Sequence, residues 1–108
     1  MLQGFIAMLV QYEHRIGLLV GSPSLAYLRR YIQGSADAFK MCGYPDVEEA
    51  LTLKWEKYVE KYYNTRETCG WENLIARNTV DGEESIKVFY ILLRSYLHEF
   101  YPQIGCDT

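Results

Sequence analysis

The two histidines are the first candidates for acid–base or metal chemistry, and each stands beside a glutamate, in the pairs Glu13-His14 and His98-Glu99. A metal site on a helix places its ligands three or four positions apart, where their side chains share one face. Adjacent residues instead point to different sides of a helix. The sequence therefore predicts neither a metal site at His14 or His98 nor any other cofactor.

The three cysteines, Cys42, Cys69 and Cys106, are widely spaced and form no Cys-x-x-Cys pair. This spacing indicates neither zinc ligation nor a disulfide framework, so we expect three free thiols in a reducing cytoplasm. The chain also lacks the Gly-x-Ser-x-Gly elbow that presents a nucleophilic serine. We therefore do not expect an enzyme, although groups that are distant in sequence could still meet in the fold.

Gly21-Ser22-Pro23-Ser24 is the one stretch that could hold an anion, at the start of a helix. It lacks the lysine and the glycine pattern of a phosphate-binding loop. We interpret it as a helix start, with Ser22 as the capping residue and Pro23 at the first helical position.

Composition sets the class of protein. A chain of 108 residues, of which 49% are hydrophobic, is expected to form one domain over residues 1–108. Its net charge of −3 argues against nucleic-acid binding, which needs a clustered positive surface, and suits a basic protein partner. The apolar run 5–10 is too short to span a bilayer and has no basic leader, so neither a membrane nor export is expected.

Hydrophobic spacing predicts an all-α, single-domain bundle of about five helices. The expected helices cover residues 2–14, 23–42, 47–64, 71–78 and 83–101, and residues 103–108 are expected to form a loose tail. No stretch alternates with the two-residue period of a sheet. Asp46 with Glu49, and Asp81 with Glu84, have the spacing of a capping box, and Gly43 suits the position after a helix.

The turn expected at residues 15–21 and the helix after it contain unusual glycines. Gly17 and Gly21 predict a positive φ or a close backbone approach, and Gly34, inside a helix, predicts a tight helix crossing that a larger residue would overpack. The apolar stretch Leu18–Val20 is expected to tuck under the fold. Arg15 has three interpretations: a clamp on orphan helix carbonyls, a surface charge, or a ligand-binding group.

The third predicted helix carries two rows of charge. Glu49, Glu56 and Glu60 form an acidic row, and Lys54, Lys57 and Lys61 form a basic one. A mixed charged face of this kind is most often simply solvated. The next helix begins with Gly70-Trp71, and we expect the Trp71 indole to close one end of the core.

Several short motifs occur in a fixed order along the chain. They are Arg15-x-Gly17-x-x-x-Gly21, Ser24-Leu25-x-x-Leu28, Ile32-x-Gly34, Gly70-Trp71 and a final helix with Phe89, Leu92 and Leu93. This order resembles a family of small bacterial helical proteins that serve as immunity proteins in polymorphic-toxin and contact-dependent inhibition systems. The chain departs from the family pattern at Ile16, Leu19 and Ser35.

The resemblance implies a non-enzymatic cytoplasmic protein that binds one cognate toxin domain and protects the cell. The shared motif is structural and identifies no toxin-contacting residue. Candidates for that contact are exposed aromatic residues and acidic residues, mostly near helix starts: Tyr44, Glu56, Glu60, Glu72, Asp81, Glu83 and Glu84. The alternatives are a small helical adaptor for a host protein and an enzyme whose site has no recognisable motif. The sequence does not indicate the oligomeric state.

Overall fold

The computed structural model describes residues 1–104 and confirms the predicted all-α architecture, with no strand in that part of the chain. Five helices of the described part have seven residues or more. The elements are α1 (Leu2–Gln11), α2 (Ile16–Val20), α3 (Leu25–Met41), α4 (Asp46–Glu48), a π-helical segment (Glu49–Lys54), α5 (Trp55–Tyr62), α6 (Trp71–Arg77), α7 (Gly82–Phe100) and a 3₁₀ turn (Pro102–Ile104).

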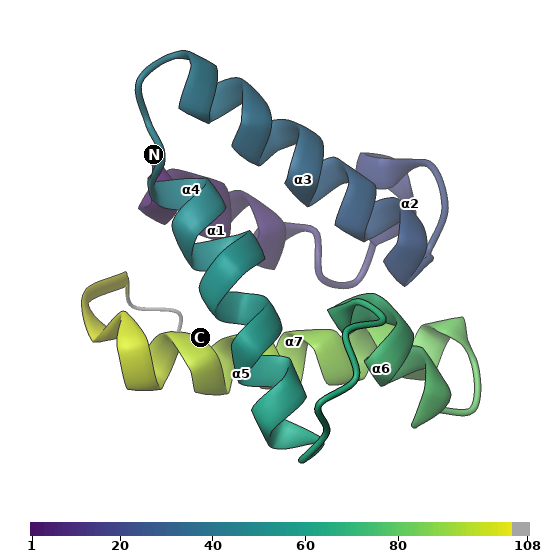
Figure 1. Ribbon diagram of the computed structural model, residues 1–108. Helices are drawn as coiled ribbons and strands as arrows, with labels where there is room; N and C mark the ends of the chain where they lie inside the picture. Colours follow the sequence, from purple (N-terminus) through teal and green to yellow (C-terminus); the bar gives the residue numbers. More distant parts are fainter. Residues whose placement is uncertain (105–108) are drawn as a thin grey trace.

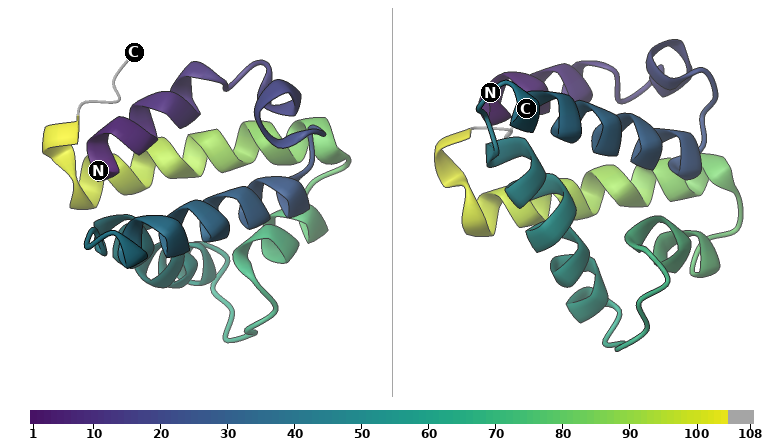
Figure 2. Two further views of the ribbon diagram at one scale, coloured as in Figure 1. Left: turned by 90° about the horizontal axis from the view of Figure 1, so that it is seen from above. Right: turned by 45° about the horizontal axis from the view of Figure 1, so that its top comes forward.

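Helices α1, α3, α5 and α6 pack around the long helix α7 (Figures 1 and 2). In Figure 1, α6 covers its N-terminal half and α5 crosses its C-terminal half. α1 and α3 lie next to each other, joined by Phe5, which stacks on Tyr31 and meets Phe39 edge-on. The buried side chains of all these helices form one hydrophobic cluster.

The middle of the core is aromatic, as the predicted helix faces require. Trp55 of α5 meets Trp71, Phe89 and Tyr96 edge-on, with ring centroids 5.4–5.7 Å apart. Edge-to-face pairs of this kind stabilise beyond the area that they bury. Trp71 is buried at the start of α6, and it contacts both Trp55 and Phe89 within this cluster.

Two buried tyrosines of α7 donate hydrogen bonds to carbonyls of other helices. Tyr90 Oη donates to Leu9 O at 2.7 Å, and Tyr96 Oη donates to Ala50 O at 2.5 Å. Ala50 lies in the π-helical segment, where the backbone hydrogen bonds shift register, so Tyr96 supplies a donor where the helix is irregular. Burial raises the pKa of both phenols, which therefore remain protonated donors.

Tyr96→Phe is expected to lower the free energy of unfolding by about 1–3 kcal/mol, because it leaves the buried Ala50 carbonyl without its donor. The ring and its contact with Trp55 are kept, so the loss measures the hydrogen bond. Urea unfolding of the variant beside the exposed-site control Tyr27→Phe checks this value. Equal stabilities for the two variants would contradict the assignment.

The segment between α1 and α3 differs from the sequence-based expectation. Residues 16–20 form the short helix α2 rather than a turn, and Gly21 ends it with a φ of +92°, as glycine permits. Ile16, the first residue of α2, is buried, and Leu19 and Val20 are half-buried against the core, whereas Leu18 is 77% exposed. The expectation that residues 18–20 tuck under the fold is therefore wrong for Leu18. A five-residue helix can bury only one side, and Ile16, Leu19 and Val20 share it.

α3 begins at Leu25 and not at Pro23. Ser24 occupies the extended N-cap position and makes no side-chain cap hydrogen bond, so the prediction that Ser22 caps this helix is wrong. The chain around Pro23 instead lies against the start of α7: a Cβ added at Gly82 would stand 3.3 Å from Pro23 O. Leu25 and Leu28 are buried, in keeping with a structural role for their motif.

The other unusual residues of this region have ordinary surroundings. Gly17 lies inside α2, where neither a positive φ nor a clash requires glycine, since an added Cβ would make ordinary contact with Pro23 at 3.5 Å. Arg15 is exposed and its guanidinium stands 5.3 Å from the centre of the Tyr12 ring. It is therefore a surface charge over an aromatic ring and not a clamp on helix carbonyls.

Gly34 is exposed on α3, and an added Cβ would meet nothing within 4 Å, so the predicted helix crossing at this residue is wrong. The buried face of α3 instead runs through Leu28, Ile32 and Ala36. Glycine on the open face of a helix costs stability without a packing reason.

Gly34→Ala is accordingly expected to raise the free energy of unfolding by about 1 kcal/mol, through helix propensity and a less flexible unfolded chain. Thermal melting followed by circular dichroism checks the sign. Gly43→Ala is the contrasting change, because Gly43 has a φ of +90° that alanine rarely adopts, and it should lower the melting temperature. A loss of stability in Gly34→Ala would show an unseen constraint at that residue.

The helix ends test the capping predictions. Asp81 confirms one, since its carboxylate accepts a hydrogen bond from the Glu84 amide at 2.9 Å. Asp46 contradicts the other, since α4 already begins there and its carboxylate accepts hydrogen bonds from the amides of Val47 and Leu2, both at 3.0 Å. It thereby ties the start of α1 to the start of α4.

The end of α3 agrees with the sequence-based prediction, and the C-terminal region differs from it in part. Gly43 follows α3 as predicted: its amide donates to Lys40 O at 3.0 Å, and the next amide donates to Phe39 O at 2.8 Å. Residues 103 and 104 belong to a 3₁₀ turn, and Ile104 packs on the core, so the predicted loose tail is wrong for these two residues. Residues 105–108, including Cys106, lie outside the described part. None of the helices in residues 1–104 has the length and apolar character needed to cross a bilayer.

Candidate functional site

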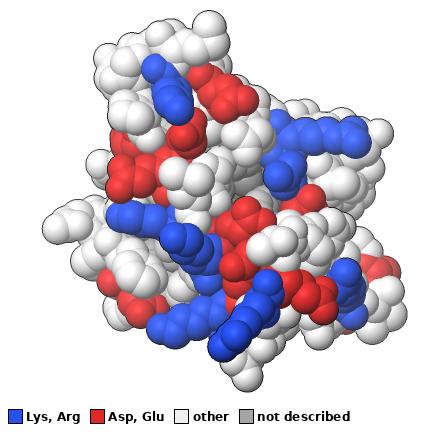
Figure 3. All heavy atoms as spheres, viewed as in Figure 1, with Lys and Arg blue, Asp and Glu red and all other residues white. Residues whose placement is uncertain are grey.

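The structure brings together three of the seven predicted contact residues. Glu56, Glu60 and Glu72 line one cleft of about 750 Å³, which we call the acidic cleft. Its other lining residues are Arg29, Leu53, Lys57, Thr68, Cys69 and Gly70. In Figure 3, acidic side chains gather between α5 and α6, with basic side chains along their edges.

Local geometry explains how these carboxylates come to face one another. Glu56 and Glu60 are one turn apart on α5, so they share a face. Glu72 lies in the first turn of α6, where the helix dipole stabilises a negative charge. Gly70 holds this turn with a φ of +99°, and a Cβ there would stand 2.6 Å from Glu72 Oε1. Only glycine therefore allows the Glu72 carboxylate to lie where it does.

The cleft has more negative than positive charge close to its walls. Arg29 Nε lies 3.2 Å from Glu72 Oε1 and forms an ion pair with it. Burial, together with the negative charges of Glu60 and Glu72, raises the pKa of the Glu56 carboxyl, and Arg29 opposes this only in part. The ionised Glu56 carboxylate is thus held in surroundings that disfavour its charge.

Glu56→Gln is expected to make the protein more stable at neutral pH. A carboxyl whose pKa is raised by folding costs free energy when it is ionised, above its ordinary pKa of 4.5, and that cost disappears as the pH falls below this value. Urea unfolding at about pH 7 and about pH 4 should therefore show a gain for the variant only at the higher pH. Glu99→Gln, at an exposed position on α7, is the control. A variant less stable than the native protein at neutral pH would contradict this account.

The charged residues of α5 place like charges one turn apart, which does not stabilise the helix. Glu56 and Glu60 are four residues apart, and so are Lys57 and Lys61. Like charges at this spacing destabilise a helix by about 0.2–0.5 kcal/mol per pair, and an exchange of two residues would turn both pairs into attractive ones. The pattern therefore costs stability and gives α5 one acidic and one basic side.

The remaining predicted contact residues lie elsewhere. Asp81, Glu83 and Glu84 are exposed at the start of α7, where Asp81 serves as the helix cap. Glu83 lines a separate depression together with Arg15. Tyr44 is 48% exposed at the turn after α3 and lines neither of these two depressions.

The two histidines and the two cysteines of the described part of the chain share no site with one another. His14 is exposed in the turn after α1, and His98 is exposed on α7. Cys42 is exposed, and Cys69 is half-buried in the wall of the acidic cleft. No group of three or more His, Cys, Asp or Glu side chains within residues 1–104 is arranged to hold a metal ion.

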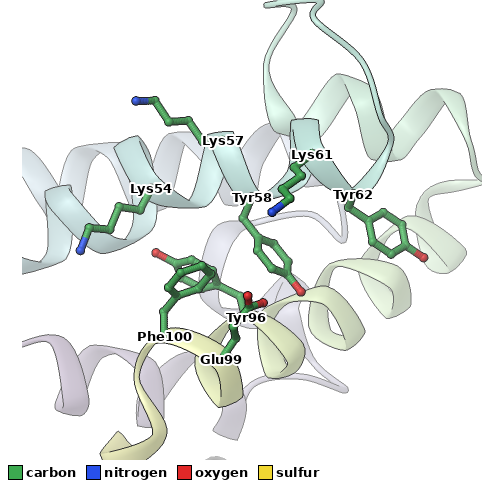
Figure 4. Close-up of a pocket in the computed structure, with 8 residues that line it drawn as sticks. All are labelled: Lys54, Lys57, Tyr58, Lys61, Tyr62, Tyr96, Glu99 and Phe100. Atoms are coloured by element: carbon green, nitrogen blue, oxygen red, sulfur yellow. The ribbon is translucent and has the colours of Figure 1, made fainter.

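A second cleft, on the basic side of α5, was missed by the sequence analysis. This aromatic groove of about 530 Å³ lies between α5 and the C-terminal end of α7 (Figure 4). It is lined by Lys54, Lys57, Tyr58, Lys61, Tyr62, Tyr96, Glu99 and Phe100. The lysine row was visible in the sequence, but we interpreted it as a solvated face and did not predict the aromatic rings that lie beside it. Phe100 is 52% exposed here.

The chain thus has two candidate binding surfaces on neighbouring faces of α5, one acidic and one aromatic with a basic rim, and Lys57 borders both. Searches of protein-family models, curated proteins and solved structures find no match to this chain.

Proposed function

We propose that this chain is a cytoplasmic immunity protein, which binds the toxic domain of a cognate toxin and neutralises it without catalysis. The observation that carries the proposal is the acidic cleft, which Glu56, Glu60 and Glu72 line together. The order of short motifs in the sequence supports the same function. The partner would be a basic protein surface, such as that of a nuclease.

A cationic side chain from a partner would relieve the repulsion that the cleft contains. The raised pKa of Glu56 reflects burial and the neighbouring negative charges, so an inserted arginine or lysine would find carboxylates short of counter-charge. Leu53, which is 58% exposed in the same cleft, offers an apolar contact beside them. An apolar contact next to charged pairs is a common arrangement at the centre of a tight interface.

The charge pattern of α5 supports binding over a purely structural role. The Glu56–Glu60 and Lys57–Lys61 pairs each cost stability, and a helix under selection for stability alone would alternate these charges. A negative surface also speeds the encounter with a basic partner and makes association sensitive to salt. A small adaptor that binds a basic host protein would use the same surface, and it is the alternative that the experiment must separate.

The test is growth protection. The toxin domain encoded beside this chain's gene is expressed in a susceptible cell, alone or together with this protein. We expect arrest in the first case, growth in the second, and co-purification of the two proteins in equal amounts. Equal arrest in both cases, with both proteins soluble, would overturn the immunity function. A basic host protein captured in equal amount on the same cleft would then establish the adaptor function.

A further inference from the structure

We propose that the aromatic groove binds a small amphipathic carboxylate, whose apolar chain covers the aromatic floor while its carboxylate pairs with the lysines of the rim. The groove borders the acidic cleft at Lys57, but Glu56, Glu60 and Glu72 do not line it, so binding in the groove can be measured independently of toxin binding.

The floor is built from rings of two helices that already contact one another. Tyr58 of α5 lies 5.2 Å from Tyr96 and 6.2 Å from Phe100, measured between ring centroids. Tyr96 and Phe100, one turn apart on α7, are 5.5 Å apart. Phe100 is 52% exposed and Tyr62, at the end of the groove, is 60% exposed. Aromatic surface in a concave site therefore faces water, although an apolar ligand would cover it favourably.

The rim is positively charged. Three lysines and one carboxylate, that of Glu99, line the groove. Lys54 is held by Glu49 at 3.4 Å and by the Tyr101 hydroxyl at 3.5 Å. Lys61 makes no ion pair within residues 1–104, and Figure 4 shows its ammonium group extending toward the Tyr58 ring, while that of Lys57 points away from the rings.

This combination of charge and shape selects the class of ligand. An excess of positive charge beside an apolar floor favours a molecule with one anionic end and one apolar end, and it disfavours neutral or cationic analogues. The volume of about 530 Å³ lies in the range of small-molecule sites, which are largely apolar with a few placed polar groups. Lys61 is the residue we assign to the carboxylate, and Tyr62 and Phe100 to the chain.

Decanoate, kept below the concentration at which it forms micelles, is the probe, and decanol and decyltrimethylammonium are its neutral and cationic counterparts. Trp55 reports on the groove, since its ring stacks on Tyr58 at 6.1 Å and meets Tyr96 at 5.4 Å. Calorimetric titration and Trp fluorescence should show saturable binding of one decanoate per chain. The two counterparts are expected to bind at least about ten-fold more weakly, because they lack the charge that the lysines attract.

The variants use exposed residues, so that the fold is kept. Lys61→Gln is expected to weaken decanoate binding by about five- to ten-fold, whereas Lys87→Gln, the same change at an exposed residue of α7 outside the groove, should leave it unchanged. Tyr62→Ala should weaken decanoate and should weaken a longer-chain homologue more, so that the difference between their affinities becomes smaller.

Three results would overturn the inference. They are the absence of saturable decanoate binding, equal affinity for decanol and decanoate, and an equal effect of Lys61→Gln and Lys87→Gln. Sedimentation of the native protein and of Tyr62→Ala tests whether a second copy of the chain occupies the groove instead. If the native protein is a dimer that Tyr62→Ala dissociates, the groove is covered by a second copy of the chain and does not take a small carboxylate.

Discussion

Glu60→Lys should weaken toxin binding by about 100-fold and at the same time make the isolated protein slightly more stable. The new lysine would place a positive charge in the acidic cleft, where the partner's own cation is expected, and reversal of a charge at the centre of an interface typically costs several kcal/mol. On the helix itself, Glu56 and the new lysine one turn later would form an attractive pair in the favourable order, in place of two repelling carboxylates. Lys57, three residues before the new lysine, would repel it and offset part of this gain, so the net gain in stability should be about 0.2–0.5 kcal/mol.

Opposite signs for the two effects make this prediction sharp. Calorimetric or surface-binding measurements with the toxin domain give the loss of affinity, and urea unfolding gives the stability. Glu99→Lys is the matched control, because it makes the same charge change at an exposed residue of α7 outside the acidic cleft. If the control and Glu60→Lys weaken binding equally, only net charge matters and the cleft is not the contact surface.

The predicted contact residues at the start of α7 provide a further comparison. Reversal of Glu83 and Glu84 together should slow association in proportion to the lost negative charge, with a smaller effect on the lifetime of the complex. A larger loss of affinity here than for Glu60→Lys would move the interface to the start of α7 and leave the acidic cleft unused.

Trp55→Ala should destabilise the fold by about 3–5 kcal/mol, the largest loss expected from a single core substitution in this chain. The indole is 1% exposed and its ring joins α5 to both α6 and α7, through Trp71, Phe89 and Tyr96. Its removal leaves a cavity that three ring systems from two other helices cannot all move to fill. A protein of this size has a total stability of only about 5–15 kcal/mol, so the variant is expected to be partly unfolded at about 37 °C.

Trp55→Phe separates the ring from its polar group. The indole nitrogen of Trp55 is buried without a hydrogen-bond acceptor in the described structure, so its loss removes an unsatisfied donor and offsets part of the lost volume. We therefore expect Trp55→Phe to cost less than half of what Trp55→Ala costs in urea unfolding. Tyr62→Ala, at a 60% exposed site on the same helix, is the control and should change stability little. A full-size loss in Trp55→Phe would show that the indole shape, and not its ring contact, is what the core requires.

Local patterns in the sequence predicted those features that depend on neighbouring residues. The spacing of Ile86, Phe89, Leu93 and Leu97 predicted α7 and its buried face, because helix periodicity acts over a few turns. Asp81 and Gly43 predicted helix ends because a cap bonds its own backbone within three or four residues. Gly34 was misread and Arg15 was left with three interpretations for the opposite reason, since a residue type alone does not show whether another element packs against it.

The candidate site was only partly predictable. Glu56 and Glu60 share a helix, so their common face follows from their spacing. That Glu72 faces them depends on how α6 packs on α5, through Trp71 and the positive φ of Gly70. The aromatic groove likewise exists only because α5 crosses the end of α7 and leaves Tyr62 and Phe100 uncovered.

The sequence by itself determined the helical class and the two charged rows of residues 49–61, because each of these follows from residues within a few turns of one another. The tertiary structure alone decided which rows meet which surfaces. Glu56 and Glu60 share a cleft with Glu72 of α6, and the lysine row borders the rings of α7. These contacts are determined by the angles at which the packed helices cross. The crossing angles depend in turn on how side chains from distant segments fill one shared core.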